Sequence, residues 1–204
     1  MYRIKATKLF KRFRNLKVLK DINFDLTTGD SMAIVGRNGS GKSTLLQVLL
    51  STYTPTKGKV EYFSDEKAMD DSQIRSQIAL VSPYLNLYDQ LTAEENLKFF
   101  STVSGLNITG KEIEVLFDRV GLGGRGLDYV GGYSSGMKQR LKYAVALLKK
   151  PGFLFLDEPT SNLDDQGKEI VFNIIEEFKP LSIVIIATNE KEEYRLVEKQ
   201  LRVD

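Results

Sequence analysis

Cysteine, histidine and tryptophan are all absent from this chain of 204 residues. Without cysteine the chain has no disulfide, no thiolate nucleophile and no iron–sulfur ligand, and without histidine it also lacks the usual zinc ligands. The absence of histidine excludes serine–histidine–aspartate triads and every histidine general base. Any chemistry must therefore use carboxylates, lysine, serine, backbone groups or a bound divalent cation.

Long apolar runs and a strong net charge are missing as well. Continuous apolar runs such as Ala144–Leu148 and Ile183–Ala187 are far shorter than the ~18 residues that a membrane-spanning helix needs. The segment Met1–Lys5 lacks the apolar core of a signal peptide. The net charge of +2 favours no polyanionic partner. We therefore expect a cytoplasmic protein that reaches a membrane only through a partner.

The hydrophobic pattern predicts an α/β protein. Alternating apolar and polar residues predict half-buried strands, whereas short apolar runs predict buried ones. The predicted strands are Tyr2–Leu9, Ile22–Leu26, Ser31–Val35, Lys59–Phe63, Ile78–Val81, Phe153–Leu156 and Ser182–Ala187. Helices are predicted at Thr44–Leu50 and Asp164–Phe178, and helical patterns run from Thr92 to Leu148.

These elements predict a single domain, over residues 1–204, with a helical insertion. Residues 1–83 and 151–204 are expected to form a core in which an N-terminal antiparallel β lobe precedes a mostly parallel sheet flanked by helices. Residues 84–150 are expected to form an α-helical subdomain. Thr92 and Glu95 form a capping box where its first helix begins.

A glycine-rich loop between a predicted strand and a predicted helix carries the strongest motif. Residues 36–43 read GRNGSGKS and fit the phosphate-binding pattern G-x-x-x-x-G-K-[ST]. Glycines let the backbone wrap around phosphates, so that N–H groups and the helix N-terminus face the anion. We expect Lys42 to reach the β- and γ-phosphates and Ser43 to ligate Mg²⁺. The expected nucleotide-binding residues are Gly36, Asn38, Gly39, Ser40, Gly41, Lys42, Ser43 and Thr44.

Two carboxylates end the predicted strand Phe153–Leu156. Asp157 in this position is expected to hold the Mg²⁺ ion, and Glu158 to polarise the attacking water. The alternative is a strand that simply ends at a charged turn. The phosphate-binding loop upstream favours the catalytic interpretation.

The order of the motifs resembles the ATP-binding cassette (ABC) ATPases, over the whole chain. Tyr133–Met137 resembles a variant of their LSGGQ signature, keeping the serine and the second glycine. Ser161–Asp164 resembles the D-loop, and Phe13 resembles the aromatic residue on which adenine stacks. The resemblance implies a P-loop NTPase fold, ATP and Mg²⁺ as ligands, and nucleotide contacts by Phe13, Ser134, Gly136 and Asp164.

The resemblance also implies two kinds of partner. One is a second ABC ATPase subunit, in a head-to-tail dimer, most simply a homodimer, that holds two ATP molecules between the subunits. The other is an integral-membrane permease, which docks on such cassettes at the position of the apolar segment Pro83–Tyr88 and holds the protein on the cytoplasmic face of the membrane. Plainer roles remain open: Ser134 and Asp164 also suit helix capping, Phe13 also suits ordinary packing, and Pro83–Tyr88 also suits packing at the junction of the lobes.

Two positions depart from the family pattern. Pro83 stands where the family has the glutamine of its Q-loop, and Asn189 stands where it has a histidine that contacts the γ-phosphate. Asparagine can donate a hydrogen bond to the γ-phosphate but cannot carry a positive charge. Because Glu158 is retained, we expect hydrolysis that is slower, or more dependent on a partner, than is usual for the family.

Three functions follow from these observations. The first is the ATP-hydrolysing subunit of an ABC transporter with a separate membrane subunit. The second is a non-transport ABC ATPase acting on DNA or the ribosome, but the chain has neither heptad repeats nor a second cassette, and nucleic acid is not an expected partner. The third is a weakly hydrolytic regulatory module, which Pro83 and Asn189 keep open.

Overall fold

The computed structural model describes residues 1–203, which fold as two compact units. The first unit comprises residues 1–78, 151–158 and the carboxyl-terminal segment from Glu176. The second comprises Ala79–Lys150 and Pro159–Ile175. The expected helical subdomain, residues 84–150, thus lies within the second unit, which also takes in the segment after Glu158.

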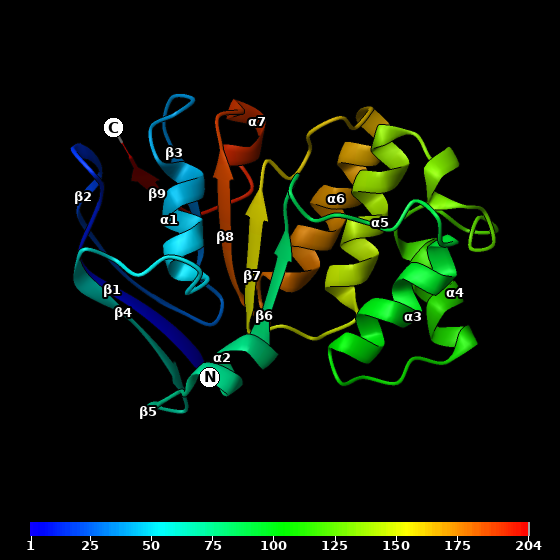
Figure 1. The fold of residues 1–204 in the computed structure, drawn as a ribbon, viewed down its shortest axis with the longest axis horizontal. Helices are drawn as coiled ribbons and strands as arrows, with labels where there is room; N and C mark the ends of the chain where they lie inside the picture. Colours follow the sequence, from blue (N-terminus) through cyan, green and yellow to red (C-terminus); the bar gives the residue numbers. More distant parts are fainter. Residues whose placement is uncertain (204) are drawn as a thin grey trace. The chain divides into compact units, whose positions relative to one another are not determined.

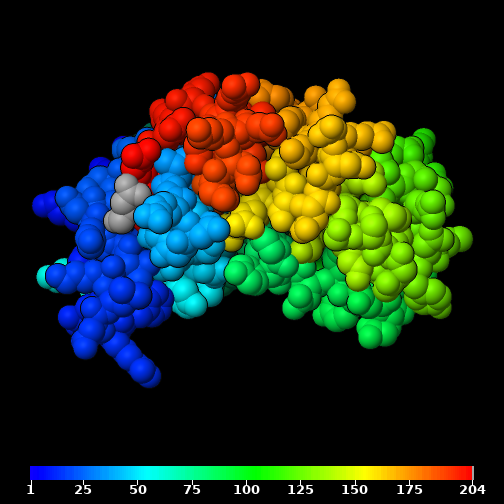
Figure 2. Space-filling model, turned by 90° about the horizontal axis from the view of Figure 1, so that it is seen from above, coloured from blue at the N-terminus to red at the C-terminus, as the bar shows by residue number. Residues whose placement is uncertain are grey.

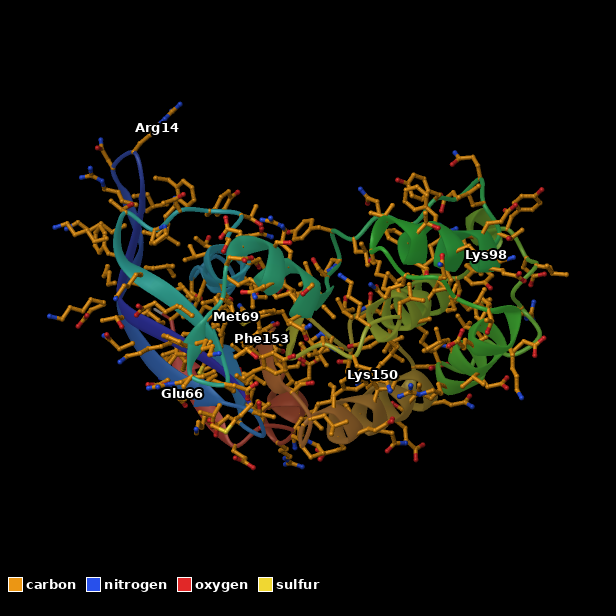
Figure 3. All side chains as sticks on the ribbon, turned by 90° about the horizontal axis from the view of Figure 1, so that it is seen from below. Arg14, Glu66, Met69, Lys98, Lys150 and Phe153 are labelled. Atoms are coloured by element: carbon orange, nitrogen blue, oxygen red, sulfur yellow. The ribbon has the colours of Figure 1, made fainter. Side chains whose placement is uncertain are left out.

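An antiparallel sheet opens the first unit. It contains β1 (Tyr2–Phe13), β2 (Leu16–Thr27), β4 (Lys57–Ser64) and β5 (Lys67–Ala68), in the order β2-β1-β4-β5. Both strands of the β1–β2 hairpin run further than the alternating pattern predicts, because backbone pairing continues through polar residues. Arg14 lies at the turn of this hairpin and points outward (Figure 3).

A parallel sheet forms the core of the first unit. Its strands β7 (Phe153–Asp157), β8 (Ile183–Thr188), β3 (Ser31–Val35) and β9 (Lys199–Arg202) pair in that order. Every residue of β3, β7 and β8 is buried, as the continuous apolar runs predict. Helix α1 (Lys42–Leu49) packs against β7 and β8.

Because these strands are parallel, their carboxyl ends meet at one edge of the sheet, as the arrows of β7 and β8 show in Figure 1. The loop after β3, the residue after β7 and the residue after β8 therefore emerge at the same edge. Ligands of open α/β sheets bind at this edge. The topology alone thus gathers three separate segments of the sequence into one candidate site.

The second unit is helical, as predicted. It contains α3 (Ala93–Val103), α4 (Gly110–Arg119), α5 (Ser135–Leu147) and residues 165–175 of α6 (Asp165–Phe178). Helices α3 and α4 both pack against α5 (Figure 1). Capping boxes begin α3 and α4, at Thr92 with Glu95 and at Thr109 with Glu112.

Several short elements were not predicted from the sequence. They are β5, α2 (Asp71–Gln77), the single turn of 3₁₀ helix Val130–Gly132, α7 (Lys191–Tyr194) and β9. β6 (Ile78–Val81) has the predicted bounds. Among residues 1–203, no helix has the length and apolar character that crossing a bilayer requires. The expected α/β fold with an antiparallel β lobe and a helical lobe is confirmed.

Candidate functional site

The glycine-rich loop joins β3 to α1 and has the backbone of a phosphate cradle. Gly39 and Gly41 adopt positive φ angles of 80° and 109°, which side-chain-bearing residues rarely adopt. A Cβ atom on Gly36 would collide with the Val203 carbonyl oxygen. Gly41 is the N-cap of α1 and has no side chain, so it leaves the first N–H groups of the helix to another acceptor.

Lys42 and Ser40 have polar groups inside this loop. The buried Lys42 donates hydrogen bonds from Nζ to the carbonyl oxygens of Gly36, at 2.9 Å, and Arg37, at 3.2 Å. The Ser40 hydroxyl is buried and has no hydrogen-bond partner among the described residues. Buried polar groups are normally satisfied, so an unpaired hydroxyl in the same loop as the Lys42 ammonium group fits a loop that receives an anion.

Ser43 and Asp157 bring two oxygen ligands together from α1 and β7. The Ser43 hydroxyl donates to Oδ1 of Asp157 at 3.4 Å, and Asp157 is only 5% exposed. Two neighbouring ligands on an octahedral Mg²⁺ ion, each at about 2.1 Å, are about 3 Å apart, so the pair fits this ion. Residues 1–203 contain no group of three or more histidine, cysteine, aspartate or glutamate side chains that could hold a metal ion.

Burial raises the pKa of the Asp157 carboxyl, and the neighbouring Glu158 carboxylate adds to this effect. The Ser43 hydroxyl and the Lys42 ammonium act in the opposite direction but do not cancel the increase. A cation at this carboxylate would favour its charged form.

Glu158 directly follows β7 and is exposed at the edge where the strands end. Its φ angle is 49°, in the left-handed region, although it carries a full side chain. Such strain costs on the order of 1–3 kcal/mol and persists at functional sites where the surroundings fix it. Here its backbone N–H is fixed by a 2.9 Å hydrogen bond to the Ala187 carbonyl oxygen.

Asn189 follows β8 and lines a depression of about 890 Å³ beside the phosphate-binding loop. Figure 2 shows the two segments in contact, the loop after β3 in light blue and the segment after β8 in orange-red. Tyr194, Gln200 and Arg202 line the same depression. These three residues were not predicted from the sequence, because α7 and β9 have little apolar periodicity; Leu201 between polar neighbours is a weak strand signal.

Phe13 lies at the end of β1, outside the residues that line this depression. The residue is 39% exposed, and its ring meets the ring of Tyr53 edge-on, with 5.5 Å between centroids. The Lys11 ammonium lies 4.8 Å from the centroid of the Phe13 ring. Stacking of adenine on Phe13 stays a prediction, and Tyr53 is a second aromatic residue that the sequence analysis did not single out.

The signature and D-loop residues lie in the second unit. Ser134 is the N-cap of α5, where its hydroxyl accepts from the Met137 N–H at 3.2 Å. Asp164 accepts from the Gly167 N–H at 2.8 Å at the start of α6. Both residues therefore cap helices, and their contacts with nucleotide stay predictions. A Cβ atom on Gly136 would lie 3.1 Å from the Asn162 carbonyl oxygen, so the signature and D-loop backbones approach closely here.

Comparisons with known proteins identify the family of this chain. The family model described as "ABC transporter" matches residues 19–161. The uncharacterized ABC transporter ATP-binding protein YxlF of Bacillus subtilis is 37% identical over 183 residues, which cover 89% of this chain and 60% of YxlF. The bacitracin transport ATP-binding protein BcrA of Bacillus licheniformis is 38% identical over 164 residues, covering 80% and 53%. The chain thus spans little more than half the length of these relatives.

A solved structure gives the same result for the fold. A dimeric bacterial ABC transporter cassette superposes with a TM-score of 0.85 at 25% identity, covering 98% of this chain and 94% of the cassette. The family model spans most of the chain, and its match includes the phosphate-binding loop, the signature and the Asp157–Glu158 pair. The relatives YxlF and BcrA are named as ATP-binding proteins. This protein therefore belongs to the ABC transporter family.

Proposed function

We propose that this protein binds ATP with Mg²⁺ and hydrolyses it to power a transporter whose membrane subunit is a separate polypeptide. The main support is the meeting, at one edge of the parallel sheet, of the loop around Lys42 with the Ser43–Asp157 pair. The site combines an ammonium group, a helix N-terminus and a pair of hard oxygen ligands for a cation. This combination suits a nucleoside triphosphate with its cation better than it suits other anions.

Each residue of the site has a specific task in this proposal. Lys42 leaves the carbonyl oxygens of its own loop and binds the β- and γ-phosphates, while Ser43 and Asp157 hold Mg²⁺ directly or through water. When bound there, the ion would supply positive charge that neutralises and orients the phosphates. Glu158 accepts the proton of the attacking water. Asn189 donates a hydrogen bond to the γ-phosphate.

The complete site requires a second subunit in this proposal. The N-terminus of α5, with Ser134 and Gly136, would face the γ-phosphate held by the partner. A helix terminus contributes at most about 2 kcal/mol toward binding an anion, which suits a closing half-site rather than a primary one. The dimeric state of the superposed cassette supports the same arrangement.

The membrane partner is inferred from the relatives and from one exposed segment. The relatives' names describe ATP-binding proteins of transporters. Tyr84 and Tyr88 in the segment Pro83–Tyr88 are 74% and 44% exposed, and exposed aromatic side chains suit a protein interface. Docking there would place the protein on the cytoplasmic face of the membrane.

The first experiment is steady-state ATP hydrolysis by the purified chain, with Mg²⁺ or with a chelator. We expect turnover that requires Mg²⁺ and that Lys42→Ala and Glu158→Gln abolish, with loss of ATP binding only in Lys42→Ala. ATP binding that survives Lys42→Ala unchanged would refute the site. Co-purification from membranes with a polytopic protein supports the transport role, whereas salt-sensitive nucleic-acid binding supports the non-transport alternative.

One observation favours a second candidate, a regulatory module that binds ATP but hydrolyses it weakly. Asn189 beside the phosphate-binding loop supplies no imidazole, and Pro83 supplies no side-chain hydrogen bond at the Q-loop position. The same assay separates the two functions. Tight ATP binding without Mg²⁺-dependent turnover, even in the presence of the membrane subunit, supports the regulatory module.

A further inference from the structure

The docking loop, defined here as Ser82–Gln90, is an irregular segment of the second unit, and it is fastened at its beginning to helix α5. Lys142 of α5 donates from Nζ to the carbonyl oxygens of Ser82, at 3.1 Å, and Pro83, at 3.0 Å. Both the Tyr84 and Leu85 N–H groups also bond to Ser82, at 3.1 Å each. Pro83 has no N–H and no polar side chain, so its carbonyl is its only hydrogen-bonding group.

The far end of the docking loop is fastened to the same helix. Lys138 Nζ and Asp89 Oδ1 lie 2.8 Å apart. Lys138 and Lys142 are four residues apart, so they project from one face of α5. Two lysines on one helix face therefore hold the two ends of the loop.

A buried asparagine holds the loop between these ends. Asn96 of α3 is fully buried, accepts from the Tyr88 N–H at 2.8 Å and donates to the Tyr88 carbonyl oxygen at 3.0 Å. Tyr88 also packs edge-on against Phe99, with 4.8 Å between ring centroids. The middle of the loop is thus fixed to α3, which itself packs on α5.

The two attachments to α5 are not equal. The Lys138–Asp89 pair joins two partly exposed side chains, and such pairs contribute little net stability. Lys142 is half-buried, burial lowers its pKa, and it donates to two backbone carbonyl oxygens. Hydrogen bonds from a charged donor are about twice as strong as those between neutral groups. Lys142 is therefore the main attachment.

We propose that Lys142, assisted by Lys138, is a positioning residue that makes the docking loop and α5 move as one body, so that nucleotide engagement at the start of α5 reaches the exposed face around Tyr84. Ser134, at the start of α5, precedes Lys142 by two turns, about 12 Å along the axis. A helix is rigid enough to transmit a displacement over this length. An irregular loop follows the displacement only where hydrogen bonds attach it to the helix. This inference rests on the proposed ATP-dependent dimer.

The fastening is tested first by amide hydrogen exchange on the full chain without nucleotide. Lys142→Met keeps the apolar stem and removes the ammonium, so we expect exchange at Tyr84 and Leu85 to accelerate at least about tenfold, while α5 stays protected. Lys142→Arg should stay close to the wild type, and Lys138→Met should have a smaller effect. Unchanged exchange at Tyr84 and Leu85 in Lys142→Met would overturn the fastening.

Transmission is tested by tryptophan fluorescence, excited at wavelengths that the remaining tyrosines do not absorb. The chain contains no tryptophan, so Tyr84→Trp introduces a single one at an exposed position. In a Tyr84→Trp, Glu158→Gln background, we expect ATP to form a dimer on size exclusion and to shift the tryptophan emission. Adding Lys142→Met should not affect dimer formation but should remove at least about half of the emission shift. Adding Lys142→Arg in its place should keep the full shift.

The outcomes separate this inference from the function on which it rests. A background variant that forms no ATP-dependent dimer refutes the proposed function, and the exchange experiment still decides the fastening. A dimer without any emission shift, or a shift that Lys142→Met leaves intact, overturns the transmission. If Lys142→Met loses both the emission shift and the dimer, and Lys142→Arg loses both as well, the substitutions have damaged the fold. This result also counts against the positioning role of Lys142.

Discussion

The backbone N–H of Glu158 donates a hydrogen bond to the carbonyl oxygen of Ala187, at 2.9 Å. This bond comes directly after the last paired residues of β7 and β8, Asp157 and Ala187. It holds Glu158 in a left-handed conformation that a non-glycine residue adopts only under constraint. The pairing of two strands distant in sequence therefore fixes the backbone of the proposed general base.

Replacing Glu158 with glutamine should keep this backbone geometry, because the two side chains have the same shape and the hydrogen bond is made by the main chain. The amide cannot accept the proton of water, so we expect turnover to fall at least about 100-fold. ATP binding should persist, and an ATP-bound dimer should accumulate on size exclusion. Unchanged steady-state turnover would remove Glu158 from its assigned role.

Replacing Ser43 with alanine or Asp157 with asparagine should weaken Mg²⁺ binding in the presence of ATP. In a pair only 3.4 Å apart, Ser43→Ala removes one oxygen ligand and Asp157→Asn removes the negative charge of the other, so we expect the Mg²⁺ concentration for half-maximal activity to rise about tenfold or more. Nucleotide binding measured without Mg²⁺ is the control and should change little. An unaltered Mg²⁺ dependence in both variants contradicts the metal site.

Replacing Asn189 with histidine should raise the rate of hydrolysis. The imidazole adds a donor that can carry positive charge beside the γ-phosphate, whereas the asparagine amide is always neutral. We expect the steady-state turnover number to rise by about tenfold, and Asn189→Ala to lower it. The absence of any gain in Asn189→His counts against the idea that asparagine limits the rate.

Replacing Gly136 with alanine should weaken both the fold and the dimer, whereas Gly132→Ala is a matched control. A methyl group at Gly136 lies 3.1 Å from the Asn162 carbonyl oxygen, but at Gly132 it meets no atom within 4 Å. Overpacking costs about 1–3 kcal/mol, and replacing glycine with alanine inside a helix returns about 0.5–1 kcal/mol. We therefore expect the free energy of unfolding to fall by about 1 kcal/mol. Urea unfolding measures this free energy. Equal losses in Gly136→Ala and Gly132→Ala would refute the close approach of Gly136 to the Asn162 carbonyl oxygen.

The local patterns of the sequence predicted much of this fold. The apolar runs of β3, β7 and β8, the capping box at Thr92 and the glycine-rich loop each depend on a few neighbouring residues. Propensity and capping act over such short distances. The elements that escaped prediction, such as β9, have little apolar periodicity, and their conformation depends on pairing with a distant strand.

The sequence by itself determined the chemistry of this protein: a lysine and a serine after glycines, two carboxylates after an apolar strand, and no histidine. Only the tertiary structure decided which groups meet. Asp157 reaches Ser43, and Lys142 reaches the Pro83 carbonyl oxygen, through parallel strand pairing and through the packing of α5. In the sequence, Lys142 has no distinguishing mark, because the partner of a long side chain is set by residues far away along the chain.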